Sequence, residues 1–299
     1  MYRKVLVGYD TSDEARDALA LAKQLASLSG ADLVVAGVFQ FDPVWGGFDP
    51  RFRDADVDYA REIEEAAASV GAQPEAFPSS SPARGLHELA EEIAADLIVV
   101  GSAHHGRLGQ VLAGNVGVAL LHGSPCAVAI APRGYRDHNG EGLTTIAVGF
   151  DGSPESNEAL TAASELASAA SAKLRLVSVA VPPERASLRA GVGWEALLEA
   201  IQIHTRDQLA EAQRSVTEGI EVDVSLVTGD PADALADVAT TPGTLLVVGS
   251  RGYGALRRVL LGSVSTKLVR SAACPLVVTP RGMHEPTGPT GTAQAETVS

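Results

Sequence analysis

The sequence is poor in cysteine, in aromatic residues and in long apolar runs. Its 299 residues are 4% aromatic and include two cysteines, Cys126 and Cys274, too few for a disulfide framework or a thiolate metal cluster. No run approaches the roughly 20 apolar residues of a membrane-spanning helix. The first residues, MYRKVLVGYD, lack the apolar segment and cleavage site of a secretory signal. We therefore expect a cytoplasmic protein that does not associate with membranes.

Positive charge is also scarce. Lys and Arg number 23 against 37 Asp and Glu, which gives a formal net charge of −14. Such a field repels nucleic-acid phosphates and anionic lipids, so we expect neither as a partner. The hydrophobic content of 45% and charged content of 20% are ordinary for a protein with sizeable cores. The length is about twice the roughly 150 residues of a typical domain and predicts two domains.

The chain contains one unit twice. VLVGYDTS at 5–12 returns as IAVGFDGS at 146–153, and LIVVGS at 97–102 returns as LLVVGS at 245–250. Cys126 and Cys274 hold matching places and are interpreted as core residues. We predict domains over 1–136 and 143–282, a polar linker between them, and a disordered tail over 283–299.

Each copy alternates strand and helix patterns. Strands are expected at 4–9, 33–39, 73–77, 127–131 and before Gly101, and again at 146–150, 174–179, 221–227, 275–279 and before Gly249. Helices are expected after Ser12 and Ser153 and at 57–70, 84–95, 114–121, 194–216, 231–240 and 262–271. This order predicts an α/β protein of two tandem doubly wound, five-stranded parallel sheets, Rossmann-like in kind. Such sheets bind ligands where the strand order reverses, so we expect the site after the first and fourth strands.

A glycine-rich loop follows the fourth strand of the second copy. It reads Gly249-Ser-Arg-Gly252-Tyr-Gly254 and continues to Gly262-Ser263, with the spacing G-x2-G-x9-G-S. Glycines let backbone N–H groups approach an anion closely, and the start of a helix favours phosphate. Arg251 adds positive charge to an acidic chain. The alternative is a glycine-rich turn with a capped helix and a solvated basic face.

Two further positions in each copy are expected to lie near the loop that follows its fourth strand. Asp10 and Asp151 follow the first strands, where a carboxylate accepts hydrogen bonds from a ribose or helps to hold phosphate-bound Mg²⁺; the alternative is a turn residue or helix cap. Val38 and Val179 end the second strands, where a backbone N–H and C=O can contact an adenine edge; the alternative is core packing.

The first copy departs from the glycine pattern. His104 stands where the second copy has Gly252, and Asn115 stands in place of Ser263. An imidazole can still hydrogen-bond a phosphate, with a strength that depends on pH, and Asn115 can cap a helix. The adjacent pair His104-His105 has no third ligand nearby, so we expect no metal site there. We expect a nucleotide in the second copy and also in the first.

At these residues the chain resembles the universal stress protein family in its tandem form, over residues 1–282. The resemblance rests on V-G-x-D-x-S, on V-V-G-S-R-G-x-G with the spacing above, and on closing strands that end in Pro-Arg-Gly. It implies an adenine-nucleotide alpha-hydrolase-like fold, ATP or AMP as ligand, and a role as a stress-response sensor or regulator. It also implies that the closing strands pair into an intramolecular pseudo-dimer; we further expect a homodimer of chains.

The resemblance also assigns roles to residues. Asp151 lies near the ribose, Val179 contacts the adenine, and the loop glycines surround the phosphates. The full set of predicted nucleotide-binding residues is Gly149, Asp151, Val179, Gly249, Arg251, Gly252, Gly254, Gly262, Ser263, Val264, Ser265, Gly8, Asp10, Val38, Gly101, His104, Gly106, Gly114 and Asn115. Bound nucleotide is expected to order the glycine loop and the segments 41–56 and 181–193.

The enzyme alternatives lack their motifs. No G-x-x-x-x-G-K-[ST], G-x-S-x-G, S-G-G-x-D-S or H-I-G-H is present, and no base with a charge clamp is recognisable. We therefore expect no enzyme, apart from slow incidental ATP hydrolysis. Two alternatives remain open: an ATP-hydrolysing or adenylate-transferring enzyme on the same fold, and a nucleotide-free interaction scaffold.

Overall fold

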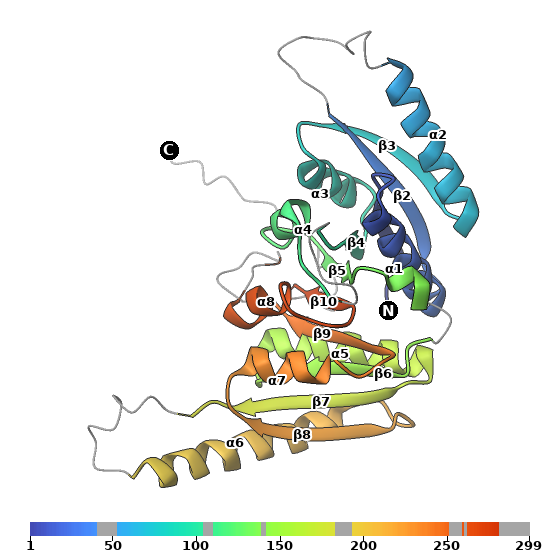
Figure 1. The fold of residues 1–299 in the computed structure, drawn as a ribbon. Helices are drawn as coiled ribbons and strands as arrows, with labels where there is room; N and C mark the ends of the chain where they lie inside the picture. Colours follow the sequence, from blue (N-terminus) through green and yellow to red (C-terminus); the bar gives the residue numbers. More distant parts are fainter. Residues whose placement is uncertain are drawn as a thin grey trace, which may run out of the picture.

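The computed structural model describes residues 1–40, 53–103, 110–138, 142–182, 193–250, 259 and 262–280. Strands and helices alternate along this part of the chain (Figure 1). The first half contains β1 (Lys4–Gly8), α1 (Asp13–Ser29), β2 (Asp32–Gln40), α2 (Arg53–Val70), β3 (Gln73–Ser79), α3 (Pro82–Glu92), β4 (Leu97–Gly101), α4 (Asn115–Leu120) and β5 (Ala127–Ala131).

A short 3-10 helix, η2 (Tyr135–His138), leads to the second half. That half contains β6 (Thr145–Gly149), α5 (Pro154–Ala170), β7 (Lys173–Ala180), α6 (Trp194–Ser215), β8 (Val222–Thr228), α7 (Pro231–Val238), β9 (Thr244–Gly249), α8 (Ser263–Leu268) and β10 (Leu276–Thr279). The predicted doubly wound α/β class is confirmed.

The strands of both halves form one continuous ten-stranded sheet. Its order is β3-β2-β1-β4-β5-β10-β9-β6-β7-β8. Pairing within each half is parallel, and β5 pairs with β10 antiparallel, with Ala129 opposite Val277. The expected pairing of the closing strands is therefore confirmed. The strand order reverses between β1 and β4 and again between β6 and β9, which places two switch points in one molecule.

Helices cover both faces of this sheet. One core joins the sheet to α1, α2, α5 and α6 and contains Leu21, Ile63 and Leu209. The other joins it to α3, α4, α7 and α8 and contains Leu120 and Leu268. Successive strand residues point to opposite faces, so a strand buried on both sides reads as a continuous apolar run.

Capping residues place the first helix of each half. The Ser12 hydroxyl accepts a hydrogen bond from the Ala15 N–H at 3.1 Å, and Ser153 caps the Ser156 N–H at the same distance. The helix before β4 was predicted from residue 84, but it begins at Pro82 because Ser81 caps it. The Ser-Pro signal that was used at Ser153 applies here as well.

The last helix is shorter than predicted. The expected helix over 262–271 ends at Leu268, after which the N–H groups of Arg270 and Ser271 bond three residues back, to Lys267 and Leu268. The carbonyls of Val269 and Ala272 accept hydrogen bonds from the first half of the chain instead. Tertiary contacts thus end this helix. The predicted tail at 283–299 lies outside the described residues.

We expect a charge at the β5–β10 junction to destabilise the whole molecule. Val277 is fully buried in the middle of this pairing. Because a carboxylate there has no partner, Val277→Asp should lower the free energy of unfolding by about 3 kcal/mol or more. Val224→Asp, on the edge strand β8 with 37% of the residue exposed, is the control and should change it by less than about 1 kcal/mol. Urea denaturation checks both; equal effects would contradict a central role of this pairing.

Candidate functional site

Two crevices lie at the two switch points. Crevice 1 has a volume of about 530 Å³ and brings together six predicted residues: Gly8, Asp10, Val38, Gly101, Gly114 and Asn115. Crevice 2, about 240 Å³ as bounded by the described residues, brings together Gly149, Asp151, Val179, Gly249 and Val264. Residues from both first and fourth strands meet in each crevice, as the strand order requires.

The aspartates at the crevice mouths have one oxygen fixed locally. Asp10 Oδ1 accepts a hydrogen bond from the Ser12 N–H at 3.2 Å, and Asp151 Oδ1 accepts one from Ser153 N–H at 3.0 Å. Thr11, between Asp10 and Ser12, has φ of 66°, a left-handed conformation that this turn imposes on a non-glycine residue. Both carboxylates are exposed. The turn therefore holds each carboxylate at the rim of its crevice.

Two of the predicted glycines, Gly101 and Gly249, are required by packing against backbone. A Cβ on Gly101 would lie 2.2 Å from the backbone oxygen of Glu14, and one on Gly249 would lie 2.6 Å from that of Glu155. The ends of β4 and β9 thus pack directly on the first turn of α1 and of α5, the helices that follow the first strand of each half. At Gly8 and Gly149 an added Cβ would instead meet a terminal methyl group, of Leu86 in α3 at 2.8 Å and of Leu235 in α7 at 2.9 Å. At these positions glycine sets the shape of the crevice floor.

The short helices α4 and α8 begin at glycines without a side-chain cap. Gly114 and Gly262 are both extended, with φ of −72° and −82°. Among the described residues, no acceptor is bonded to the backbone N–H groups of 115–117 or of 263–265. Asn115 and Ser263 are exposed at these first helical positions. The N–H groups therefore remain available to an anion at the crevice.

Ser265, one of the predicted nucleotide-binding residues, is hydrogen-bonded to the residue that precedes its own helix. Its hydroxyl accepts a hydrogen bond from the Gly262 N–H at 2.8 Å and is buried, and it is not among the described lining of crevice 2. Thr266 Oγ1 donates to the Gly262 carbonyl at 2.6 Å. The first half has Gly117 in place of Ser265 and lacks this clamp. Ser265 thus positions the peptide that precedes α8.

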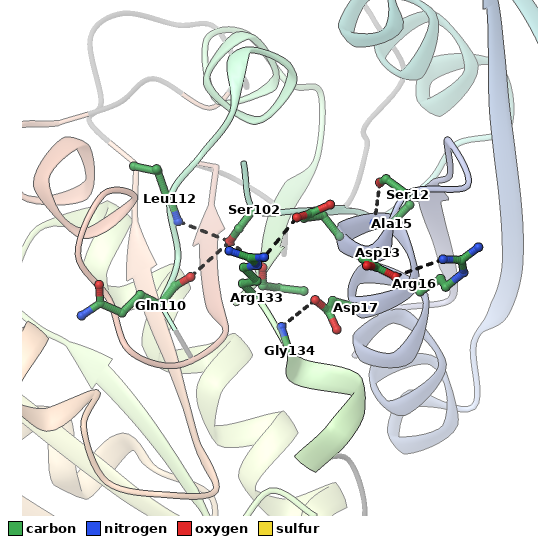
Figure 2. A network of polar contacts seen from close by, with 12 residues as sticks. Ser12, Asp13, Ala15, Arg16, Asp17, Ser102, Gln110, Leu112, Arg133 and Gly134 are labelled. Carbon is green, nitrogen blue, oxygen red and sulfur yellow. Dashed lines mark hydrogen bonds and ion pairs between the residues drawn. The ribbon is translucent and has the colours of Figure 1, made fainter. Parts of the chain in front are cut away.

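Two kinds of site residue were missed from the sequence. Ser102 Oγ donates to the Ala131 carbonyl at 2.7 Å and accepts from the Leu112 N–H at 3.3 Å, which ties the end of the glycine loop to β5 (Figure 2). Its counterpart Ser250 lines crevice 2 and is buried, and its hydroxyl has no hydrogen-bond partner among the described residues. The repeated V-V-G-S was a signal for both serines.

Tyr59 of α2 is the second missed contribution. Its hydroxyl donates to the Tyr9 carbonyl at 2.6 Å, and its ring meets Phe39 edge-on at 4.9 Å. Burial raises the pKa of Tyr59 to about 12, so the phenol stays protonated and remains a donor at neutral pH. No sequence motif marks this residue.

Other candidates fall outside this geometry. Arg251, Gly252, Gly254, His104 and Gly106 lie outside the described residues, as do 41–52 and 183–192. The start of α2 lies within the segment 41–56 that was predicted as a loop. Cys126 and Cys274 are buried, and burial raises the pKa of each thiol to about 12, so both stay protonated in the core.

The fold and its two crevices define a tandem, doubly wound α/β protein. A model of the universal stress protein family matches residues 1–132 and again 142–280. The chain is 30% identical to a universal stress protein of Mycolicibacterium smegmatis, over 93% of this chain and 97% of that protein. It is 29% identical to one of Mycobacterium tuberculosis, over 92% and 99% respectively. The chain belongs to the universal stress protein family.

Solved structures agree on the fold. The crystal structure of a universal stress protein from Archaeoglobus fulgidus has a TM-score of 0.67 at 21% identity, over 93% of this chain and 98% of that one. The crystal structure of a candidate universal stress protein from Pseudomonas aeruginosa has a TM-score of 0.62 at 17% identity, over 94% of this chain and 95% of that one. The family membership and fold predicted from the repeated motifs are confirmed.

We expect the packing glycines to matter for stability. Gly101→Ala places a Cβ against the Glu14 backbone and should cost about 1–3 kcal/mol in the free energy of unfolding, because α1 or β4 must shift. Gly117→Ala is the matched control: its Cβ would meet the nearest atom at 3.4 Å, and alanine favours the helix. Thermal denaturation of the two variants tests this, and equal stability would show that the close approach is not a constraint.

Proposed function

We propose that the chain binds an adenine nucleotide, ATP or AMP, in each crevice and acts as a stress-response sensor or regulator. One observation carries this proposal. In both halves a carboxylate, the end of a buried strand and the start of a short helix with unpaired N–H groups converge on one cavity. A nucleotide has three parts, sugar, base and phosphate, that suit these three elements.

The phosphates belong at the starts of α4 and α8. The chain has a net charge of −14, so an anion binds it only where local donors outweigh the general field. Backbone N–H groups at 115–117 and 263–265 supply such donors without a charged side chain. Asn115 and Ser263 add a side-chain hydrogen bond at the same positions.

The nucleoside belongs deeper in the crevice. Asp10 and Asp151 each keep one carboxylate oxygen outside the turn hydrogen bond, in position for a ribose hydroxyl. Val38 and Val179 are half-buried at the ends of β2 and β7, where an adenine meets both backbone and apolar surface. The 530 Å³ of crevice 1 lies within the roughly 300–1,000 Å³ of small-molecule sites.

A divalent cation fits this site only together with the nucleotide. Among the described residues, no group of three His, Cys, Asp or Glu side chains is arranged to hold a metal ion. Mg²⁺ keeps several waters and commonly uses one or two carboxylates plus phosphate oxygens. Asp10 or Asp151 is the carboxylate available for that role, and the ion would neutralise charge between it and the phosphates.

The proposed regulatory role rests on a change of shape of the protein when it binds the nucleotide. A nucleotide changes the shape of the protein only if it binds one conformation more tightly than another. We propose that a protein partner reads this change, and that the chain works in the cytoplasm as a homodimer. Of the described helices, none has the length and apolar character needed to cross a bilayer.

The direct test is to analyse what the purified protein carries. Acid-denatured protein should release ATP or AMP, resolved by anion-exchange chromatography. Absence of any adenylate, together with no binding of added ATP or AMP in calorimetry, would favour the scaffold. Rapid release of ADP or pyrophosphate from added ATP would favour the enzyme.

We expect an acidic residue at the start of either short helix to block its crevice. Ser263→Asp favours α8 through the helix dipole but repels a phosphate, so crevice 2 should lose at least about tenfold in ATP affinity while stability is kept. Asn115→Asp should do the same in crevice 1. Ser263→Ala and Asn115→Ala are the controls and should lose only about 0.5–1.5 kcal/mol, the contribution of one hydrogen bond. Calorimetric stoichiometry measures the result; unchanged binding in both Asp variants would refute the phosphate assignment.

A further inference from the structure

Described residues that precede α4 and α8 are hydrogen-bonded to the opposite half of the chain. The β4–α4 segment, which runs from Ser102 to Gly114, donates from Val111 N–H to the Ala272 carbonyl at 2.6 Å and from Ala113 N–H to the Val269 carbonyl at 2.7 Å. Both acceptors follow the C-terminal end of α8. Residues 111–113, which lead into α4 at crevice 1, are thus bonded to residues that follow α8.

The reverse contact is present as well. Val259, in the β9–α8 segment of the second half, donates its N–H to the Ser124 carbonyl at 3.0 Å and accepts from the Gly123 N–H at 2.8 Å. Gly123 and Ser124 follow the C-terminal end of α4. Val111 and Val259 occupy corresponding places in the repeat, and both are fully buried in the core that the two halves share.

Each of the helices α4 and α8 therefore contacts a crevice at one end and the opposite half at the other. The N-terminal end of α4 lines crevice 1, and the residues that follow its C-terminal end are hydrogen-bonded to Val259 of the second half. For α8 the two ends are exchanged, with Val264 in crevice 2. Both helices pack on the same face of the sheet on either side of β5 and β10 (Figure 1). Each has six residues, so a displacement at one end moves the other end with it.

We propose that Val111 and Val259 are positioning residues that couple the two nucleotide crevices. The inference rests on the proposed function, since it concerns how that nucleotide binds. In the anchored state Val259 is hydrogen-bonded to Gly123 and Ser124, and in the released state it is not. A nucleotide bound at the start of α8 favours the anchored state, which fixes the residues after α4 and so the N–H groups of crevice 1. By thermodynamic reciprocity, a nucleotide in crevice 1 favours binding in crevice 2 by the same factor.

The coupling also explains why the contact uses backbone groups under buried valines. A main-chain hydrogen bond fixes the segment in one register, and the fully buried side chain excludes water from it. Burial makes the anchored state cooperative, because releasing the segment exposes the valine and breaks the hydrogen bonds together.

The test separates a local role of Val259 from a role in the other crevice. In Ser263→Asp protein, which keeps only crevice 1 for ATP, we expect a second change, Val259→Ala, to weaken ATP binding at crevice 1 by about fivefold or more. Val259 belongs to the segment of crevice 2, so a purely local role leaves crevice 1 unchanged. The mirror experiment uses Asn115→Asp with Val111→Ala and measures crevice 2.

Val128→Ala is the matched control. Val128 is a fully buried valine of β5 in the same core and takes no part in either segment. In the Ser263→Asp background it should leave ATP affinity at crevice 1 within about twofold, although it loses the same two methyl groups. Hydrogen exchange at the Gly123 amide gives a second measurement: ATP should increase its protection in the unaltered protein.

The outcomes distinguish the two proposals. Unchanged crevice 1 affinity in the Val259→Ala protein, or an equal loss in the Val128→Ala protein, overturns the coupling while nucleotide binding stands. Failure of the unaltered chain to bind ATP or AMP overturns the proposed function itself. A loss in Val259→Ala alone, with increased Gly123 protection on addition of ATP, supports the coupling.

Discussion

The antiparallel pairing of β5 with β10 determines how the rest of the molecule is arranged. Each half is a complete doubly wound unit. Its closing strand has a hydrogen-bonded neighbour at both edges only because the other half extends the sheet. Because the pair is antiparallel, the carboxyl ends of the two sets of strands lie at opposite edges of one sheet. The crevices are therefore separate, while α4 and α8, beside the pairing, are brought next to each other.

The glycines of the repeat serve two different physical purposes. At Gly101 and Gly249 a side chain would enter the backbone of the first turn of α1 or α5, so packing alone requires glycine there. At Gly114 the nearest atom to an added Cβ lies at 3.5 Å, and the backbone angles suit any residue. Packing does not explain Gly114, whereas the proposed function does, because a glycine leaves the adjacent N–H groups open to the phosphates of the proposed nucleotide. A ligand is thus best inferred from the glycines at the helix starts rather than from those at the strand ends.

Much of the fold followed from the sequence because its signals are local. Alternating valine-rich runs and Ser-capped helices located the elements, and the repeat fixed the topology, including the closing strands at Ala127–Ala131 and Leu276–Thr279. The positions of Asp10, Val38 and Asn115 in one crevice followed from the switch-point rule. The contributions of Tyr59 and of Val111 did not, because they depend on which distant segments meet. Likewise, the role of Ser265 depends on a hydrogen bond to Gly262 that spacing alone leaves undetermined.

Both crevices have the same glycines at the ends of their first and fourth strands. They differ in how the second helix of each half, α2 or α6, packs on the second strand. Gly37 in β2 lets α2 approach closely: a Cβ there would lie 2.0 Å from Ile63 Cδ1 and 3.0 Å from the Tyr59 hydroxyl. The corresponding residue of β7 is Ser178, which carries a Cβ, so α6 cannot pack in the same way. Gly101 and Gly249 are fixed by contacts with backbone, and a change there disturbs the whole sheet. The contacts beside Gly37 come from side chains of the single helix α2, so they differ between the two halves without disturbing the sheet. The two halves therefore share a common frame, while the residues beside each crevice differ.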